Sequence, residues 1–546
     1  MLDKSLPSLY NDSWKNIALS GTHLRRKGEE PMREKKKSLL GTAAVMAVII
    51  LLSKIFGLLR DVLVADLYGT TAPAVAYETA SRLPVLLFDL VLGGVVSAAF
   101  IPVFSELLVK EGKDSAMRYA ASYVNLIFTL SGVLTLLGMV LASPLVTLLA
   151  PELPAETHAL AVTLTRILFP MMICTGLAYS FVGILQSMGE FNIPALISLV
   201  SNTIMVLYLV FFGSRFGVTG LAVAMLCGWA AQMIVQIPKL LSFGFRPSLS
   251  AGIYSPHIRR SLALALPILI ATWTAPVCSL INTRFASALE EGRAITALGY
   301  ANRLYTIIVG VFSFVATNLL FPYFSRAAAS GDVRQSRRLM MSSVKTLTFI
   351  IAPIAAGVAV LAEPMIALLY QRGSFTAADT ALTAQALRFY AAGMLFMAAN
   401  EVLSKAFFAE NQPKIPMLTS LIAMAANIAL VIPLSRFGIG GIALASGLSA
   451  GIQCLGNALF MKRRSGEKLP LGDLFDLAKS VLAAGIMGGV LLMLLPFLPQ
   501  ETLLRCGTAV LIGAAVYALS VILLRSEEAR YLLKILRPGA RQTKGN

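Results

Sequence analysis

The sequence predicts an all-α polytopic membrane protein with about fourteen transmembrane helices. Of its 546 residues, 57% are hydrophobic and 14% are charged, whereas a soluble protein has about 25% charged residues. The mean hydropathy is +0.76. Since one span needs about 20 apolar residues, this hydrophobic content is enough for about fourteen spans. The apolar runs are continuous and do not alternate with polar residues, which excludes a transmembrane β-barrel.

The chain begins with a polar, basic leader over residues 1–37, which ends in a lysine cluster at 35–37. A secretory signal would have a brief apolar core followed by a cleavage site. Here a long apolar run follows the lysines directly, so we expect an uncleaved first span. Met32 stands just before the basic cluster, and we therefore interpret residues 1–31 as a misassigned start or a dispensable extension.

The apolar runs that follow are the predicted spans. They cover 38–67, 75–107, 117–142, 158–188, 194–214, 218–240, 258–289, 294–325, 336–361, 378–409, 415–435, 439–461, 473–496 and 502–524. The first six form an N-terminal lobe at 38–240, and the next six form a C-terminal lobe at 258–463. Two extra helices follow at 473–524, and a basic tail ends the chain at 525–546.

Five short motifs recur in the same order about 220 residues apart, which indicates an internal repeat. The pairs are Ala80-Ser81-Arg82-Leu83 with Ala301-Asn302-Arg303-Leu304, Pro102-Val103-Phe104-Ser105 with Pro322-Tyr323-Phe324-Ser325, Leu141-Ala142-Ser143-Pro144 with Leu361-Ala362-Glu363-Pro364, Ile193-Pro194 with Ile415-Pro416, and Ser214-Arg215-Phe216-Gly217 with Ser435-Arg436-Phe437-Gly438. Because six spans return the chain to the same side, the halves are parallel repeats, an arrangement typical of rocking transporters.

The charge of the chain indicates its topology. The 46 Lys and Arg exceed the 28 Asp and Glu by 18, and they lie in short clusters between alternate spans. The positive-inside rule then places both termini in the cytoplasm. We interpret the charge as this topology signal and expect no nucleic-acid partner.

Several chemistries are excluded by what the sequence lacks. Three histidines and five widely spaced cysteines argue against a metal site or disulfides, and we expect neither a metal nor another cofactor. The chain has no GxxxxGK[ST] motif for a P-loop and no nucleophile–His–acid pattern. We therefore expect a transporter and not an enzyme.

Charged residues inside spans are the candidate functional residues, because each costs about 2.5–3.5 kcal/mol at a helix centre. Lys54, Arg60 and Asp61 interrupt the first span. In the second span, Arg82 and Asp89 are seven residues apart and thus share a face. Amides inside spans, such as Asn202, are expected mainly to hydrogen-bond between helices.

The repeat extends this set of cations. It places Arg284 in span 7 loosely opposite Arg60, and Arg303 in span 8 opposite Arg82, with Asn302 as a supporting polar neighbour. The two halves would bring a ring of cations to one central cleft, which suits an anionic ligand and phosphate oxygens in particular. The structural alternative is that these side chains snorkel to the membrane surface or pair with acids.

Motifs in spans 1, 2, 8 and before span 10 carry a resemblance to a known family. They are Ser53-Lys54-Ile55-Phe56-Gly57-Leu58-Leu59-Arg60-Asp61, Ala80-Ser81-Arg82-Leu83-Pro84, Ala99-Phe100-Ile101-Pro102-Val103-Phe104-Ser105-Glu106, Gly299-Tyr300-Ala301-Asn302-Arg303-Leu304-Tyr305 and Gln371-Arg372-Gly373-Ser374-Phe375-Thr376. The chain resembles the MurJ/MviN family, the lipid II flippases of the multidrug/oligosaccharidyl-lipid/polysaccharide exporter superfamily. The resemblance runs from about residue 33 to 525 and includes the two extra helices.

The resemblance implies a V-shaped pair of six-helix lobes around a cationic cavity. Basic residues at Lys54, Arg60 and Arg303 would engage the lipid pyrophosphate, and spans 13 and 14 would form a groove for the polyprenyl tail. The chain also departs from the family. Relatives have an acid before span 2, an Arg–Arg pair within it and a Glu near its end. This chain instead has, in that order, Val75, Phe88-Asp89 and Gly93.

The resemblance also implies an ion site in some members, which couple to sodium near spans 7, 11 and 12. Asn427 could serve as a ligand there, but Val431, one turn later, could not. We therefore expect coupling to the membrane potential or to a monovalent cation, without an assigned sodium site.

The expected function is that of a flippase for lipid II, the undecaprenyl-pyrophosphate-linked peptidoglycan precursor. It would move this lipid from the inner to the outer leaflet of the bacterial cytoplasmic membrane by alternating access, in support of cell-wall biogenesis and cell shape. Expected partners are this lipid-linked glycan, membrane lipids and other cell-wall synthesis proteins.

Three alternatives stay open at this point. The first is a flippase for another polyprenyl-linked polysaccharide. The second is a multidrug antiporter, whose cationic substrates require buried acids, whereas cations outnumber acids inside these spans. The third is a membrane scaffold without transport, which loss of function on neutralising Arg303 would exclude.

Overall fold

The computed structural model describes residues 30–92, 99–248, 252, 255–310, 333–410, 412–465 and 471–530. Within these ranges the chain forms helices joined by turns, without a strand, so the predicted all-α class is confirmed. Most of the predicted leader, at 1–29, and the end of the predicted tail, at 531–546, lie outside the described residues.

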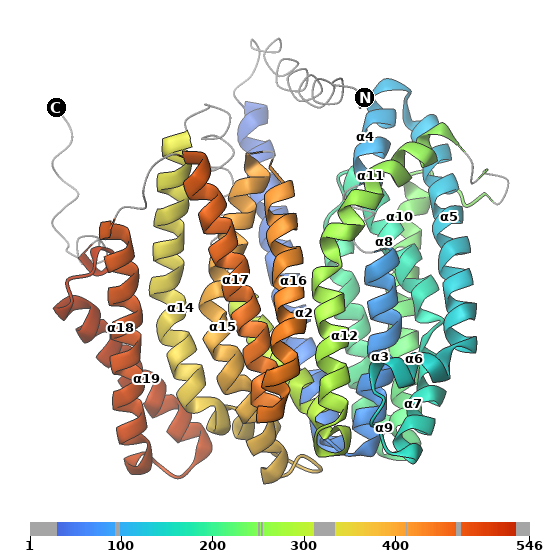
Figure 1. The fold of residues 1–546 in the computed structure, drawn as a ribbon. Helices are drawn as coiled ribbons and strands as arrows, with labels where there is room; N and C mark the ends of the chain where they lie inside the picture. Colours follow the sequence, from blue (N-terminus) through green and yellow to red (C-terminus); the bar gives the residue numbers. More distant parts are fainter. Residues whose placement is uncertain are drawn as a thin grey trace, which may run out of the picture.

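The first half of the chain forms the helices labelled α2 to α10 (Figure 1). In order these are α2 (Glu30–Tyr68), α3 (Ala72–Val91), α4 (Ile101–Lys110), α5 (Lys113–Val140), α6 (Ala142–Leu149), α7 (Ala155–Leu168), α8 (Met171–Ser187), α9 (Asn192–Ile234) and α10 (Ile237–Ser242).

The second half begins at α11 and ends at α19 (Figure 1). Its helices are α11 (Pro256–Thr272), α12 (Thr274–Ser287), a helix described over 293–310, α14 (Val333–Tyr370), α15 (Ala377–Ala409), α16 (Lys414–Leu434), α17 (Ile439–Ser465), α18 (Leu471–Leu494) and α19 (Thr502–Leu523). Short 3-10 turns are η2 (Glu290–Gly292), η3 (Ser435–Phe437) and η4 (Leu495–Phe497).

Some predicted spans are interrupted. Three spans that were predicted to be continuous each contain two helices; they are 75–107, 158–188 and 258–289. Proline explains two of these breaks, because it lacks a backbone N–H and is best accommodated where a helix begins. Pro102 lies in the first turn of α4, and Pro170 is the N-cap of α8. The third break falls at Trp273, between α11 and α12.

Two other predicted spans, 194–214 and 218–240, correspond to two arms of α9 that meet at a sharp corner. Gly217 forms the corner with a φ of 57°, a conformation that glycine adopts without steric cost. The Tyr208 hydroxyl donates a hydrogen bond of 2.8 Å to the Gly217 carbonyl. The repeated Ser-Arg-Phe-Gly motif occupies the same place in the other half, where Gly438, with a φ of 74°, separates α16 from α17.

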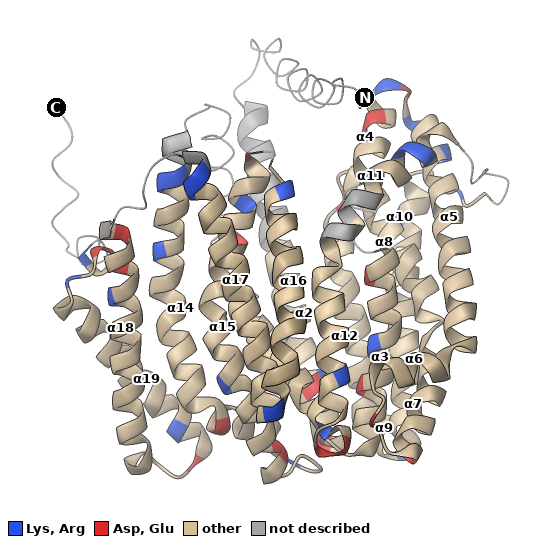
Figure 2. Ribbon diagram, viewed as in Figure 1, with Lys and Arg blue, Asp and Glu red and all other residues tan. Residues whose placement is uncertain are grey.

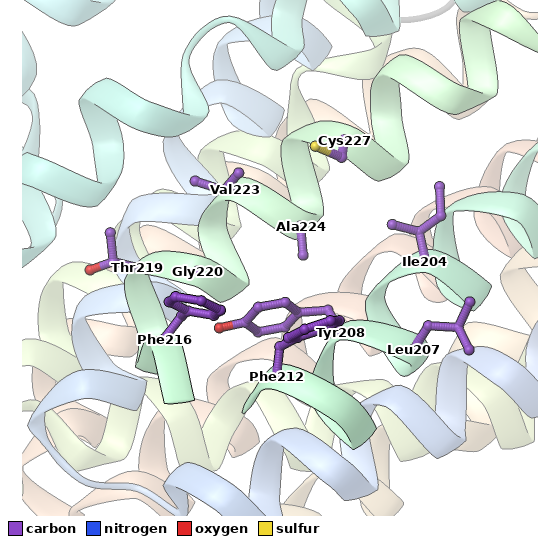
Figure 3. Close-up of a pocket in the computed structure, with 10 residues that line it drawn as sticks. All are labelled: Ile204, Leu207, Tyr208, Phe212, Phe216, Thr219, Gly220, Val223, Ala224 and Cys227. Carbon is purple, nitrogen blue, oxygen red and sulfur yellow. The ribbon is translucent and has the colours of Figure 1, made fainter. Parts of the chain in front are cut away.

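The two arms of α9 enclose a hollow of about 630 Å³ (Figure 3). Aromatic and aliphatic side chains line it, among them Tyr208, Phe212 and Phe216, and none of its lining residues is charged. Phe212 and Phe216 are also exposed on the molecular surface. We therefore interpret this hollow as part of the lipid-facing surface and not as a site for a polar headgroup.

Two hydrophobic cores lie mainly in the two lobes, although Val75, Ala150 and Leu153 of the first half are buried in the C-terminal core. The N-terminal core draws its buried residues mainly from α3 to α9, and the C-terminal core from the helix at 293–310 with α14, α15 and α17. Helix α11 contacts both lobes, because its buried Ile258 and Ala265 belong to the N-terminal core and it also contacts α16. Helix α12, which follows it, contacts α16 and α17. The residue at which one lobe ends and the next begins stays a prediction.

The two extra helices pack against the outer side of the C-terminal lobe. Helices α18 and α19 both contact α14 (Figure 1). Lys345 of α14 fixes them electrostatically, since its Nζ lies 3.0 Å from an Asp473 oxygen, 3.7 Å from Asp476 and 2.5 Å from Glu527. The Lys345 side chain is 10% exposed and that of Glu527 is 68% exposed, so the cation is shielded from solvent while one of its acids is not.

The described residues contain eight helical segments that are long and apolar enough to span a membrane. Helices α2, α3 and α15 are also long, but they carry charged residues in their middle turns. Figure 2 shows that charged residues otherwise gather at the two ends of the helix bundle. The chain is thus a multi-pass membrane protein, and the total of fourteen spans stays a prediction.

The predicted topology can be tested with two cysteines placed at Arg372 and Arg463 in a chain without its native cysteines. Both positions are exposed and lie before α15 and near the end of α17, respectively. We expect an impermeant maleimide to label position 372 from outside the cell and position 463 only after the membrane is opened. Labelling of both from the same side would contradict the span count.

Candidate functional site

Three arginines and two acids form one hydrogen-bonded cluster, which we name the central network. Its members are Arg60 and Asp61 on α2, Glu78 and Arg82 on α3, and Arg303 on the helix at 293–310. Arg303 joins the two lobes, because its Nη2 donates to Glu78 Oε2 at 2.9 Å and its Nη1 lies 3.4 Å from Asp61 Oδ1. The network therefore couples the second helix of each repeat.

Glu78 is shared between two arginines. Its Oε1 accepts hydrogen bonds from Nε and Nη2 of Arg82 at 3.2 and 2.9 Å, while its other oxygen accepts from Arg303. The four-residue spacing of Glu78 and Arg82 places them on one helix face. The remaining Arg82 nitrogen, Nη1, donates to Thr283 Oγ1 of α12 at 2.7 Å. Every nitrogen of the Arg82 guanidinium thus has a partner.

Arg60 is oriented by hydrogen bonds to its neighbour Asp61 and to Asn202 of α9. Its Nε and Nη2 donate to Asp61 Oδ1 at 3.1 and 2.8 Å, and its Nη1 donates to Asn202 Oδ1 of α9 at 2.9 Å. The Asn202 amide in turn donates to the Ser53 carbonyl at 3.3 Å. Asn202 therefore forms the hydrogen bond between helices that was expected of it, and it fixes the direction of the Arg60 fork.

In the central network the acidic side chains are more deeply buried than the arginine side chains. The side chains of Asp61 and Glu78 are 6% and 8% exposed, whereas those of Arg60, Arg82 and Arg303 are 26%, 21% and 31% exposed. The acids leave the network with one net positive charge. The three partly exposed guanidinium groups, each paired with a buried carboxylate, can donate hydrogen bonds to phosphate oxygens, which prefer planar, charged donors.

Four of the eight predicted site residues lie outside the central network. Lys54 is exposed on α2 and has no ion pair in the described part of the chain. Arg284 is exposed and donates to the Leu148 carbonyl at 2.9 Å. Asn302 is exposed and makes no hydrogen bond within the same ranges. Asp89 lines a separate pocket in the N-terminal lobe.

Glu78 and Thr283 were not predicted as site residues. Glu78 could have been found from its position one turn before Arg82 inside an apolar run. It also lies one turn after Val75, the position where the family resemblance expects an acid. Val75 is buried and apolar, so Glu78 is the acid that α3 contributes here. Gly93, another departure from the family, falls outside the described residues.

A second contact between the lobes lies at the end of the molecule that the predicted topology places outside, and we name it the outer contact. The Ser374 amide donates to the Asp66 carbonyl at 2.7 Å, and the Ser374 hydroxyl donates to the Leu67 carbonyl at 3.0 Å. Gly69 and Gly373 both have positive φ, and a side chain at either would collide with the opposite backbone. Only glycine allows the two loops to approach this closely.

Polar side chains reinforce the outer contact. The Thr70 hydroxyl donates to Asp379, whose carboxylate also accepts from Arg293 at 2.5 Å. Arg293 Nε donates to the Thr70 oxygen at 3.1 Å. Asp379 is also the partner of Thr376 in the capping box that starts α15. Thr70 is therefore the N-terminal-lobe member of this hydrogen-bonded group, and its other members, Arg293, Thr376 and Asp379, belong to the C-terminal lobe.

We expect Thr70→Val to favour opening of the outer side, because it removes two hydrogen bonds between the lobes and leaves the Asp379 cap intact. At about 0.5–1.5 kcal/mol per bond, the open population should rise at least about fivefold. Labelling of Asn302→Cys by an external impermeant maleimide measures this population. Thr70→Ser keeps the hydroxyl and should label like the parent, and equal labelling of the valine variant would contradict the prediction.

The sodium site that the resemblance raised does not fit the residues present. Asn427 is buried, and both polar atoms of its amide lack a hydrogen-bond partner within the described chain. Val431, one turn later, is also buried and offers no oxygen. In the described residues no three His, Cys, Asp or Glu side chains gather into a metal site. We assign no ion to Asn427.

The match to a family model decides the family. A model described as lipid II flippase MurJ matches residues 64–506. The chain belongs to the MurJ family. A probable lipid II flippase MurJ from Rhizobium meliloti is 29% identical over 453 residues, which cover 80% of this chain and 83% of that protein. Another from Bdellovibrio bacteriovorus is 31% identical over 429 residues, covering 77% and 81%.

Solved structures share the MurJ fold. A lipid II flippase MurJ in an inward closed conformation matches with a TM-score of 0.77 at 23% identity, covering 90% of this chain and all of that one. An inward-facing multidrug transporter of the MATE family matches with a TM-score of 0.67 at 14% identity, covering 77% and 98%. The all-α membrane fold of the MurJ and MATE structures is thus shared by this chain, and the division into two six-helix repeats stays a prediction.

Proposed function

We propose that the chain is a flippase for lipid II and carries it from the inner to the outer leaflet of the bacterial cytoplasmic membrane. The proposal rests on membership of the MurJ family and on one observation, the cluster of three partly exposed arginines between the lobes. A pyrophosphate offers several oxygens to planar donors, and each charge-assisted bond contributes about 1.5–3 kcal/mol.

In this mechanism the acids hold the arginines ready for the substrate. Glu78 accepts a hydrogen bond from Arg303, and Asp61 forms an ion pair with it. A pyrophosphate that enters the cavity would compete with these carboxylates for the same guanidinium. Lys54, which has no ion pair in the described chain, would add a further cation from α2 without giving up a partner.

The lobes would then rock about the central network. The outer contact closes the outer side, and substrate binding would favour the state in which this contact opens, since a ligand shifts an equilibrium only through its different affinity for the two states. Arg303 bonds to α2 and α3 across the lobes, so it senses their relative position. The membrane potential or an ion gradient would return the carrier to its starting state.

Other parts of the lipid would use other surfaces. The groove beside α18 and α19 would hold the polyprenyl tail, as the family resemblance implies. Both termini would lie in the cytoplasm, and the protein would act without enzyme chemistry. Other cell-wall synthesis proteins would be its protein partners.

The test is complementation of a strain depleted of its own lipid II flippase. Restored growth and cell shape are the expected results. Failure at normal membrane abundance would favour a flippase for another polyprenyl-linked polysaccharide, because that function would use the same pyrophosphate site with a different glycan.

A further inference from the structure

The N-terminal lobe contains a largely apolar pocket with one acidic residue, Asp89, in its described lining. It lies among α3, α8 and α9 and has a volume of about 240 Å³. Phe88 and Asp89 of α3, Tyr179 of α8 and Trp229 of α9 all line it. The pocket therefore draws on three helices of one lobe, and a ligand there would not need to bridge the lobes.

Asp89 is the one charged residue of the pocket lining. Within the described residues its carboxylate has neither a hydrogen bond nor an ion pair. Arg82, two turns earlier on α3, does not neutralise it, since Glu78 and Thr283 occupy all of the Arg82 nitrogens. A carboxylate inside a membrane span normally pairs with a cation, and among the described residues no side chain supplies one to Asp89.

Aromatic rings form the walls around this carboxylate. Phe88 and Tyr179 stack with their ring centroids 5.7 Å apart, and Trp229 stands on the neighbouring helix. Aromatic faces attract cations, with tryptophan the strongest of the three residue types. Met171 and Met172, whose thioether groups are polarisable, also line the pocket, and both residues are almost fully buried.

The same lining disfavours a metal ion. Hard cations need several oxygen ligands, and besides the carboxylate the described lining offers only the side-chain hydroxyls of Thr175 and Tyr179. That leaves the Asp89 carboxylate as the principal oxygen donor among mainly apolar and aromatic side chains. An anionic headgroup would be repelled by the same carboxylate.

We propose that this pocket binds a small lipophilic organic cation, with Asp89 as its counter-ion and Phe88, Tyr179 and Trp229 as its aromatic walls. The site is distinct from the central network and does not depend on the proposed lipid substrate. A ligand of this kind replaces the missing positive partner and buries its apolar groups at the same time.

The test uses benzyltrimethylammonium as the probe and the fluorescence of Trp229 as the signal. The other two tryptophans are replaced by Trp14→Phe and Trp273→Phe in the full-length protein, so that Trp229 reports alone. We expect saturable quenching, weakened at least about tenfold by Asp89→Asn and about threefold or more by Tyr179→Leu. Arg303→Ala should leave the affinity unchanged, which separates this site from the pyrophosphate site.

A neutral probe of the same shape is the matched control. Neopentylbenzene replaces the quaternary nitrogen by carbon, so Asp89→Asn should not weaken its binding. Equal affinity of benzyltrimethylammonium for parent and Asp89→Asn would overturn the proposal, as would the absence of saturable quenching in the parent. If the asparagine variant does not fold, unchanged affinity of Tyr179→Leu for the probe would overturn the proposal equally.

Discussion

Arg303→Ala is expected to abolish transport while the protein stays in the membrane at its normal level. The variant removes the fork that joins the lobes, yet Asp61 keeps Arg60 and Glu78 keeps Arg82, so neither buried acid is left without a cation. Losing one or two charge-assisted bonds of about 1.5–3 kcal/mol each should weaken substrate binding at least about tenfold.

Two companion variants make this prediction specific. Arg303→Lys keeps the charge without the planar fork and should retain partial transport. Lys54→Arg should be tolerated, since the resemblance places arginine at that position. Complementation and membrane abundance are measured together for each variant. Abundant Arg303→Ala protein with full activity would disprove a role of this arginine in transport.

A further variant separates substrate binding from structural pairing. In the double variant Glu78→Gln with Arg303→Ala, the shared acid is removed along with its partner. If Arg303 served only to balance Glu78, the double variant should recover the activity that Arg303→Ala lost. Continued inactivity is the result expected for a residue that binds the lipid.

Glu78→Gln alone is expected to bind a pyrophosphate more tightly and to transport more slowly. The Glu78 carboxylate accepts two hydrogen bonds from Arg82 and one from Arg303. Its neutral replacement releases both forks, and the substrate no longer competes with a fixed charge. We expect affinity for farnesyl pyrophosphate to rise about tenfold, in line with one charge-assisted bond, and release to slow correspondingly.

Glu106→Gln is the matched control for this variant. Glu106 also bonds two cations, Lys110 and Arg260, each at 2.9 Å, but outside the central network. Its neutralisation should leave farnesyl pyrophosphate affinity unchanged. Calorimetric titration of purified protein measures both variants, and weaker binding by Glu78→Gln would mean that the acid helps to form the site instead of competing with the ligand.

The sequence made the cationic half of the central network predictable. Arg60, Arg82 and Arg303 interrupt apolar runs, where a charge is costly and therefore conspicuous. Their tertiary partners were harder to predict, because the bond that links Glu78 to the other lobe comes from Arg303, 225 positions away. Thr283 carries no charge, and a hydroxyl inside a span usually bonds to its own helix, as Thr283 also does with Ser279.

The helix order was predictable for a similar reason, and the helix interruptions were less so. Long apolar runs identify spans by composition alone, but a break within a run depends on local geometry. Pro170 gave a readable signal for one break. At Trp273 the signal lies three residues later, at Pro276 in the first turn of α12. Arg284 was placed opposite Arg60 by the repeat, although it bonds to the Leu148 carbonyl.

The glycines of the outer contact have a consequence for the speed of opening. Gly69 and Gly373 bring main chain against main chain, so separation of these two loops frees few side-chain rotamers, whereas Val75 and Leu153 would lose their apolar contacts with the C-terminal core. Water can take over the amide and carbonyl hydrogen bonds as they part. The difference in lipid affinity between the two states then has to offset mainly the apolar contacts that opening separates, and much less the hydrogen bonds of the loops.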